Sequence, residues 1–320
     1  MATRALWAES LAPGLRAYIK DVYNQYKPLY PQVFDVMGSE KADEDFVNSS
    51  GIGLLLKTSE QAPINYEDPF EIYKTTLAHL KFSKGISVSR EAFDDDLYNI
   101  WTARGAMLGK AAARTKDMFA FDVFRGAFTT TKTSYGDGKP LCSTAHTRKD
   151  GGTAQSNASS TGIPLSEPNL EVGTLALQEV VDDKGQIITM GENGLILMVA
   201  LANRKEALIY TNSVLQPDSA QNNINVYNSN GVYSVVANPF IGSLATAVDG
   251  YTLGVNTAWF LIDKTYNGLK FLVRKAFYTT DDYVNDTETL RIQGIQRNSA
   301  GWIDWRGVWG SAGDNAAYSS

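Results

Sequence analysis

Apolar and polar positions alternate at helical spacing over the longest patterned stretch of the chain, from Asp94 to Phe128. Its apolar residues recur at steps of three and four, which places them on one helical face: Leu97, Ile100, Trp101, Met107, Leu108, Ala111, Ala112, Met118 and Phe119. Gly105, Ala106 and Gly109 leave one side narrow enough for close contact. We predict a single amphipathic helix of on the order of 50 Å, which is longer than a compact subunit needs and is typical of a strut.

A second helical pattern precedes it near the N-terminus. After Pro13, apolar and aromatic residues repeat at helical spacing until Pro28 and Pro31 end the pattern. Its polar face is not strongly cationic, which disfavours a helix lying on a membrane surface. We therefore predict an arm that packs on a protein surface.

Between these helices the pattern changes to strands, from Phe46 to Ser89. Leu54–Lys57, Phe70–Leu77 and the alternating stretch Leu80–Val88 have strand character, with a turn-rich segment between the first two. We predict a long hairpin that returns to the body. Because an isolated two-stranded hairpin is marginal in water and its edges are free to pair, we expect neighbouring chains to support it.

The rest of the chain mixes helices and strands without a regular βαβ series, which indicates an α+β fold. Thr129–Pro168 is a polar segment of roughly forty residues, far longer than the usual ~4–6-residue connection, and is predicted to be a surface or functional loop. The remaining predicted helices are Leu170–Val181 and Ala202–Tyr210. The remaining predicted strands are Ile187–Thr189, Leu195–Ala200, Val232–Ala237, Trp259–Ile262, Leu269–Lys275 and Leu290–Gln296.

Composition limits the possible classes of protein. The 320 residues are 43% hydrophobic and 20% charged, which indicates a globular chain with two lobes or one lobe with long excursions. No apolar run approaches the ~20 residues of a membrane span, and no secretory signal precedes the arm, so we expect a soluble protein that is not exported. A net charge of −6 carries no basic footprint of a sequence-reading nucleic-acid binder, so we expect any DNA to be enclosed rather than recognised.

Candidate chemistry is sparse. Cys142 and His146 could form a nucleophilic or metal-binding pair, but zinc requires about four ligands and a catalytic thiol requires a third, orienting group. The polar loop around them supplies no evident rigid frame, and we interpret the pair as incidental. Asp94, Asp95 and Asp96 fit the start of a helix better than a metal site. We expect no catalytic site, no cofactor and no metal.

Tryptophans mark candidate structural anchors. Trp302 and Trp305, near the C-terminus, are interpreted as core anchors that fix the tail rather than as stacking platforms for bases or sugars. Trp101 is placed on the core face of the long helix. If Trp101 is buried there, its replacement by alanine should cost roughly 3–5 kcal/mol.

Several motifs, in a shared order from about Phe46 to Gly310, resemble the Mu-like major head subunits, a branch of the tailed-phage major capsid proteins. The residues that carry the resemblance are Asn65–Pro69, Tyr73–Thr76, Ser89–Glu91, Asp94–Tyr98, Asp137–Cys142 with His146, Ala258–Leu261 and Gly301–Gly307.

The resemblance implies the tailed-phage major capsid fold, divided into five segments. These are an N-terminal arm (1–45), an extended β-hairpin loop (46–89), a peripheral domain with the spine helix 94–128 and a long surface loop (90–194), an axial domain (195–275), and C-terminal strands that return to the peripheral domain (276–320). The strut and the unsupported hairpin both have a place in such a subunit.

The function implied is structural. Subunits would form pentamers and hexamers, assemble in the host cytoplasm and close into an icosahedral shell around double-stranded DNA in the virion. Scaffolding, portal and decoration proteins are possible partners. Candidate subunit-contact residues are Lys57, Tyr66, Tyr73, Lys74 and Phe82.

Two alternatives stay open at this point. One is a bacterial nanocompartment shell of the encapsulin type, and the other is a soluble hydrolase with its site on the Thr129–Pro168 loop. The shell interpretation predicts that replacing Gly53 to Leu80 by a short glycine-rich turn leaves a folded subunit that forms no shells.

Overall fold

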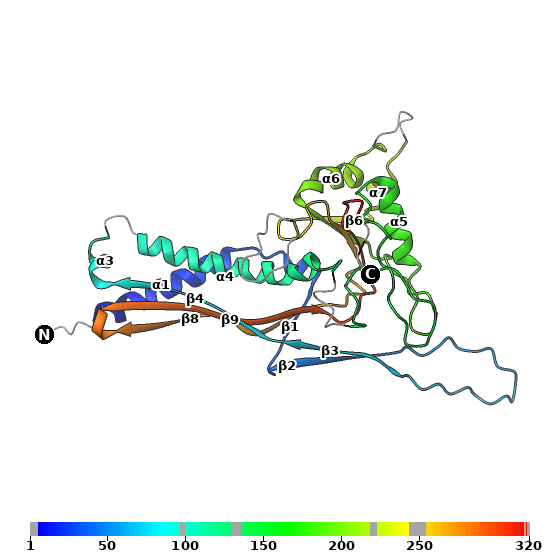
Figure 1. Ribbon diagram of the computed structural model, residues 1–320, viewed down its shortest axis with the longest axis horizontal. Coiled ribbons are helices and arrows are strands. Elements are labelled where there is room, and N and C mark those ends of the chain that lie inside the picture. The colour runs from blue at the N-terminus through cyan, green and yellow to red at the C-terminus, as the bar shows by residue number, and fades with distance from the viewer. Residues whose placement is uncertain are drawn as a thin grey trace.

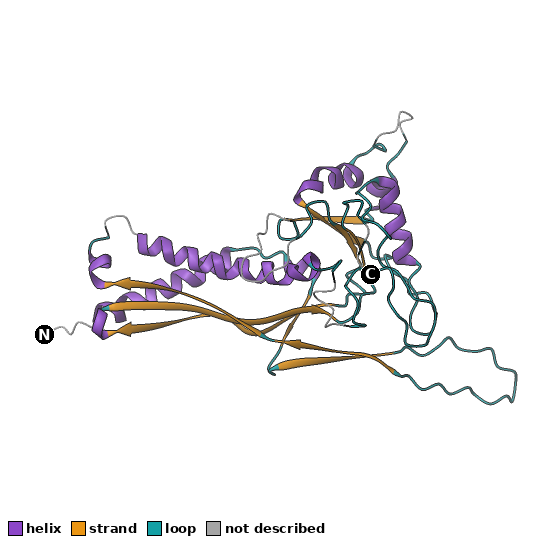
Figure 2. Cartoon of the chain, in the orientation of Figure 1, coloured by secondary structure: helices purple, strands orange, loops and turns teal. Residues whose placement is uncertain are grey.

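The computed structural model describes residues 6–96, 100–129, 136–217, 223–242, 254–316 and 318. The molecule is elongated (Figure 1). Two long helices lie along a long twisted sheet at one end, a second sheet with three shorter helices forms the other end, and a hairpin extends away from the body (Figures 1 and 2). The fold is α+β, as predicted.

The predicted strut is shorter than expected and has a break near its start. Residues Arg90–Asp94 form a separate short helix, α3, and α4 runs Ile100–Arg125, which corresponds to about 39 Å of helix. Asp96 accounts for the start of α4, because its carboxylate accepts the backbone N–H groups of Ile100 and Trp101 at 3.0 and 3.2 Å. Part of the predicted helix, residues 97–99, lies outside the described residues.

The N-terminal arm is a helix that packs on α4. This helix, α1, runs Leu6–Gln25 and contains Pro13, so it begins earlier than the sequence pattern predicted. A short helix, α2, follows at Tyr30–Val33 and carries the chain toward the sheet. Asp117 of α4 fixes this connection by accepting the Tyr26 hydroxyl at 2.7 Å and the backbone N–H of Tyr30 at 3.0 Å.

The long sheet has the strand order β1-β8-β9-β4. Its members are β1 (Asp35–Gly38), β8 (Leu269–Val284), β9 (Thr289–Trp302) and β4 (Leu80–Ser89). Only the β1–β8 pair is parallel. Both β8 and β9 extend well beyond the predicted strands, and β4, predicted as part of the hairpin, pairs with β9 instead. One face of this sheet carries α1 and α4 (Figure 1).

The hairpin itself is a separate two-stranded ribbon of β2 (Asp43–Ser49) and β3 (Glu71–Ala78). The segment between them, residues 50–70, contains no strand, so the prediction of a strand at Leu54–Lys57 was wrong. Figure 2 shows this segment as an open loop that projects from the ribbon.

The second sheet has the order β10-β7-β5-β6. Its members are β5 (Leu195–Ala200), β6 (Tyr233–Asn238), β7 (Trp259–Ile262) and β10 (Val308–Ser311), and the helices of this end are α5 (Glu167–Gln178), α6 (Arg204–Asn212) and α7 (Val226–Asn230). The predicted strand at Ile187–Thr189 is absent from the described structure, where Ile187 makes only a single bridge to Val181. The C-terminal β10, expected with the strands of the other lobe, pairs antiparallel with β7.

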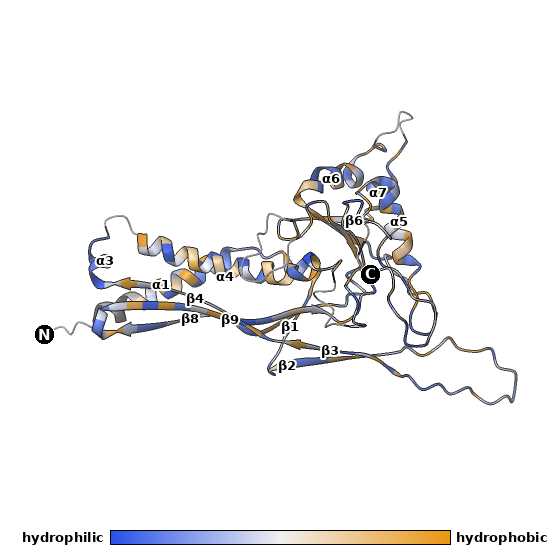
Figure 3. Cartoon of the chain, viewed as in Figure 1, coloured by the Kyte–Doolittle hydropathy of each residue, from blue (hydrophilic) through white to orange (hydrophobic). Residues whose placement is uncertain are grey.

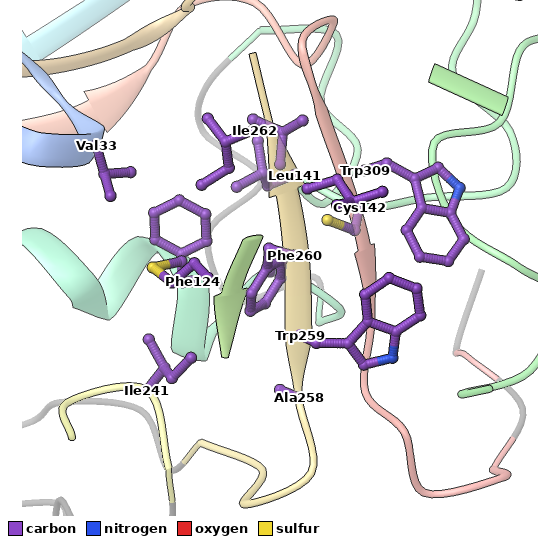
Figure 4. Packing of buried hydrophobic residues seen from close by; sticks show 14 of the residues in the cluster. Val33, Phe124, Leu141, Cys142, Ile241, Ala258, Trp259, Phe260, Ile262 and Trp309 are labelled. Atoms are coloured by element: carbon purple, nitrogen blue, oxygen red, sulfur yellow. The ribbon is translucent and has the colours of Figure 1, made fainter. Parts of the chain in front are cut away.

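The main core lies where α4 meets the second sheet (Figure 4). Phe260 of β7 is fully buried and contacts the rings of Phe124 and Phe128, with centroids at 5.0 and 5.5 Å. A smaller cluster around Ile19 and Leu108 joins α1 and α4 to the long sheet. The C-terminal part of α4 therefore anchors the strut in the second lobe.

Candidate assembly interface

The loop of the hairpin exposes apolar side chains that no described part of its own subunit covers. Leu55 is 99% exposed and Tyr66 87% exposed, and Ile52, Leu54, Leu56 and Ile64 are also exposed. Burial of an apolar side chain of this size stabilises by roughly 1.5–3 kcal/mol. A row of uncovered leucines is therefore a surface that gains free energy by contact with another chain.

The base of this loop is held in place. The backbone N–H of Ser50 donates to the carbonyl of Phe70 at 2.8 Å, and Phe70 N–H donates to the Ser50 hydroxyl at 2.9 Å. Glu67 accepts the backbone N–H of Gly53 at 2.9 Å and forms an ion pair with Lys184. These contacts fix where the loop leaves the ribbon.

The five predicted contact residues differ in their surroundings. Lys57 and Tyr66 are exposed on the loop and face no other part of the subunit that is described. Tyr73 donates its hydroxyl to the carbonyl of Thr147 at 3.0 Å, and Lys74 pairs with Asp45 at 2.8 Å. Phe82 lies on β4, where its ring is 4.9 Å from that of Phe119 on α4. Two of the five are thus free to reach a neighbour, and three are engaged within the chain.

A polar clamp joins the two chain segments that link the ribbon to the body. His79 is the only residue between β3 and β4, and Ser39 follows β1 directly. The Ser39 hydroxyl lies 2.7 Å from His79 Nε2 and donates to Glu44 at 2.8 Å, so Nε2 donates to the hydroxyl. His79 Nδ1 is buried without a hydrogen-bond partner. The ribbon is therefore joined to the long sheet by a hydrogen-bonded pair as well as by the chain itself.

The three predicted anchors also differ in burial. Trp302 and Trp305 are 1% and 4% exposed. Trp101 is only half-buried: its ring nitrogen donates to the carbonyl of Ala92 at 2.8 Å, and the guanidinium of Arg104 lies 4.3 Å from the ring centroid. We therefore expect the Trp101→Ala substitution to cost less than the roughly 3–5 kcal/mol that applies to a buried tryptophan.

The polar loop after α4 has a rigid frame, contrary to the sequence interpretation. His146 is fully buried and stacks on Trp305, with ring centroids 4.2 Å apart. Its Nδ1 lies 2.7 Å from an oxygen of Asp137 and its Nε2 lies 3.1 Å from Oδ1 of Asn157. Asn157 in turn donates to the carbonyl of Val308 at 2.9 Å. His146 is thus a core residue that ties the loop to β10, and not an incidental neighbour of Cys142.

The sequence reasoning missed Asp137 and Asn157, the two partners of His146. Asp137 belongs to a Gly-Asp-Gly segment, which is a local signal for a turn but gives no sign of a contact with His146.

 Asp137 lies nine and Asn157 eleven residues from His146, and only the folded loop brings their side chains together. Asparagine in a polar loop usually indicates a turn, so nothing in the local pattern distinguishes Asn157 as a buried partner.

Cys142 is equally unsuited to nucleophilic chemistry. It is buried at 1% exposure in the main core, and burial raises the pKa of its thiol. Across the described residues, no group of three or more His, Cys, Asp or Glu side chains is arranged to hold a metal ion. Neither a hydrolase nor a metal site is therefore supported by the loop. No helix among the described residues is long and apolar enough to cross a membrane.

The fold is similar to that of solved capsid structures. The capsid of the cyanophage P-SCSP1u matches with a TM-score of 0.58 and 10% identity over 89% of this chain and 87% of that chain. The capsid of the native GTA particle matches with a TM-score of 0.54 and 12% identity over 87% of each chain, and the virus-like particle from Pyrococcus furiosus with 0.50 and 9% over 93% and 98%. At these identities the likeness shows the fold alone.

Sequence comparison gives the family. No curated protein matches the chain. The family model described as phage capsid protein matches residues 73–311, which is well over half of the chain and includes β4, α4 and both sheets' central strands. The chain belongs to the phage capsid protein family.

Proposed function

We propose that this chain is the major capsid protein of a tailed phage, which self-assembles into an icosahedral shell that encloses double-stranded DNA. The observation that carries the proposal is the extended ribbon with its uncovered apolar loop, on a subunit of the phage capsid family. Leu55 and its neighbours become buried only when another subunit lies beneath them. The role is structural and not enzymatic.

We propose that the subunit consists of a peripheral part and an axial part, each built around one of the two sheets. The peripheral part comprises the arm helix α1, the spine helix α4 and the long sheet, and the axial part comprises the second sheet with α5, α6 and α7. Compared with the segments expected from the sequence, the arm (1–45) and the extended loop (46–89) are unchanged. Two strands are assigned differently: β8 belongs to the peripheral part from Leu269 onward, and β10 belongs to the axial part.

The finer assignments are further proposals. The motif order favours a Mu-like major head subunit. Pentamers and hexamers of this chain would assemble in the host cytoplasm, with scaffolding, portal and decoration proteins as partners, and the virion would be its final location. The net charge of −6 supports enclosure of DNA without sequence-specific binding.

A nanocompartment shell is the second candidate, because the virus-like particle from Pyrococcus furiosus has a similar fold. The family match favours the phage interpretation. Packaged nucleic acid in purified particles would support the phage capsid, whereas a single enclosed enzyme would support the nanocompartment.

The test of the proposed function removes the loop and keeps the ribbon. The structure changes the design expected from sequence, because Leu77 is buried in β3 and Leu80 begins β4. Replacing residues 53–68 by a short glycine-rich turn leaves both strands intact. We expect a folded subunit, judged by circular dichroism, that forms no closed particles in electron microscopy.

A matched control is Ile187→Ser, which alters an exposed apolar residue outside the hairpin, with 69% of its surface exposed. This variant should assemble like the unaltered chain. Closed particles of normal size from the loop deletion would refute the proposed role of the loop.

A further inference from the structure

The chain crosses one face of the long sheet where the ribbon begins. One row of register partners spans all four strands at this level: Gly38, Val273, Asn298 and Leu80. Neighbouring strands are ≈ 4.8 Å apart, so the two ends of this row are separated by about 14 Å. Ser39 and His79, the chain neighbours of Gly38 and Leu80, nevertheless have side chains 2.7 Å apart. Both residues therefore turn inward over the sheet, on the side of the ribbon and away from α4 (Figure 1).

Three polar atoms at this crossing are buried and have no hydrogen-bond partner in the part of the chain that the structure describes. They are Nδ1 of His79, Nε of Arg297 and Oγ of Ser299. Arg297 and Ser299 are two residues apart on β9 and so share a face of the sheet. It is the face opposite to Gln296, whose side chain donates to the carbonyl of Ala112 on α4 at 3.1 Å. Because unpaired buried polar groups are costly, this cluster is suited to a ligand that pairs with it.

The crossing carries positive charge. Burial lowers the pKa of His79, and Arg274 on β8 and Arg297 on β9 lie close enough to lower it further. Among the described residues, neither arginine forms an ion pair with a carboxylate, and Arg274 donates to a backbone carbonyl between β1 and β2. Lys81 and Lys275, the register partners of Arg297, are exposed beside it. Both arginines are half-buried, so the cluster can be reached from solvent.

The ribbon supplies two opposing carboxylates, but they are directed elsewhere. The strand β2 is mostly hydrophilic (Figure 3), and its Asp43 and Glu44 act to raise the pKa of His79. Glu44 accepts the Ser39 hydroxyl at 2.8 Å and lies 3.9 Å from Nζ of Lys41. The net effect on His79 is still a lowered pKa. The cluster therefore keeps an excess of positive charge that an anion would compensate.

We propose that His79, Arg297 and Ser299 form a binding site for a small tetrahedral oxyanion of the phosphate or sulfate type, with Arg274 at its rim. Such an anion offers several acceptor oxygens in different directions, which suits a guanidinium, a hydroxyl and an imidazole that approach from different segments. His79 and Ser299 are only 9% and 2% exposed, and this depth favours a free anion over a phosphate in the backbone of a DNA duplex. The site is complete within one subunit and does not depend on the proposed shell function.

Binding of the anion is coupled to a proton on His79. Because Nε2 donates to Ser39, Nδ1 carries a hydrogen only when the ring is protonated. An anion compensates the two arginines and accepts this hydrogen, so it raises the pKa of His79. By reciprocity, the anion binds more tightly as the pH falls through the range in which His79 takes up its proton.

The experiment follows the two histidines of the chain by NMR of labelled imidazole rings in pH titrations. The probe is sodium sulfate, because the charge of sulfate is constant where histidine titrates, and the reference is sodium chloride at equal ionic strength. We expect sulfate to raise the pKa of His79 by about one pH unit, which corresponds to about tenfold tighter binding to the protonated form. The signal of His146, whose ring is held by Asp137 and Asn157, should not respond to sulfate.

Three variants test the site. Arg297→Gln should abolish the response of His79 to sulfate, and Ser299→Ala should weaken it. The matched control is Arg291→Gln, which changes an exposed arginine on the same strand and the same face, about 20 Å away, and should keep the full response. An unaltered His146 signal shows that each variant is folded, and Ser299→Ala decides the matter if Arg297→Gln is not.

Two results would overturn the inference. One is the same titration of His79 in sulfate and in chloride. The other is a full response to sulfate in Arg297→Gln, or in Ser299→Ala if that variant alone folds, which would indicate an adventitious ion only. Neither result bears on shell assembly, so the inference can fail while the proposed function stands.

Discussion

The contact between α1 and α4 gives the sharpest test of the packing argument. Gly109 lies where the two helices cross, and a methyl group added there would be 2.6 Å from the backbone oxygen of Ile19 and 3.3 Å from the backbone nitrogen of Tyr23. No rotamer change can relieve a clash with backbone atoms. The Gly109→Ala substitution therefore forces α1 away from α4 by about 1 Å, a form of overpacking that typically costs ~1–3 kcal/mol.

Two effects set the net magnitude. Displacement of α1 loosens the packing of Ile19 and Val22, which are 0% and 7% exposed. Against this, alanine is better than glycine in a helix interior by about 1 kcal/mol. We expect a net loss of up to about 2 kcal/mol in the free energy of unfolding of the unassembled subunit, measured by urea titration.

Gly14 provides the matched control on the partner helix. A methyl group at Gly14 meets no atom within 4 Å, so Gly14→Ala should gain up to about 1 kcal/mol from helix propensity alone. If Gly109→Ala proves as stable as Gly14→Ala, the close approach of the two helices is not as described, and the argument that glycine is needed there fails.

Two further predictions concern the anchors and the clamp. Trp302→Ala should cost roughly 3–5 kcal/mol because the ring is buried, and Trp101→Ala clearly less because its ring is half-exposed; urea unfolding of the two variants side by side checks the order. Burial, together with the nearby Arg274 and Arg297, lowers the pKa of His79 and outweighs the opposing effect of Glu44 and Asp43. The unfolded chain then binds the proton more readily, so stability should fall as the pH drops below about 6.5, and His79→Gln should reduce that dependence in unfolding curves at several pH values.

The parts of the fold that the sequence predicted well are those where burial alone decides the pattern. Leu195–Ala200 and Trp259–Ile262 are runs of apolar residues flanked by turn residues, and the structure has strands with the same bounds. The strand β8 was predicted too short because its outer half, residues 276–284, faces solvent and is rich in polar residues. The missed end of β9, residues 297–302, is largely buried, but Asn298, Ser299 and Gly301 are residue types that usually indicate a turn. The break before α4 depends on Asp96 capping a helix, which the apolar periodicity could not show.

The candidate interface was predictable only in part. The strand pattern of residues 46–89 predicted a long hairpin, and its marginal stability and free edges indicated a need for neighbours. The clamp at His79 depends on a contact between residues far apart in the chain, Ser39 and His79, and the frame around His146 forms only when its loop folds. The local pattern around each of these residues does not show such contacts.

Paired polar groups and uncovered apolar groups lie in different parts of the subunit. Where α4 meets the second sheet, several buried polar side chains are paired: Asp137 and Asn157 hold His146, and Arg306 pairs with Asp183 at 2.8 Å. The uncovered leucines lie instead on the hairpin loop. Under the proposed function a second copy of the chain covers these leucines, so assembly gains a free energy of burial that the isolated subunit lacks.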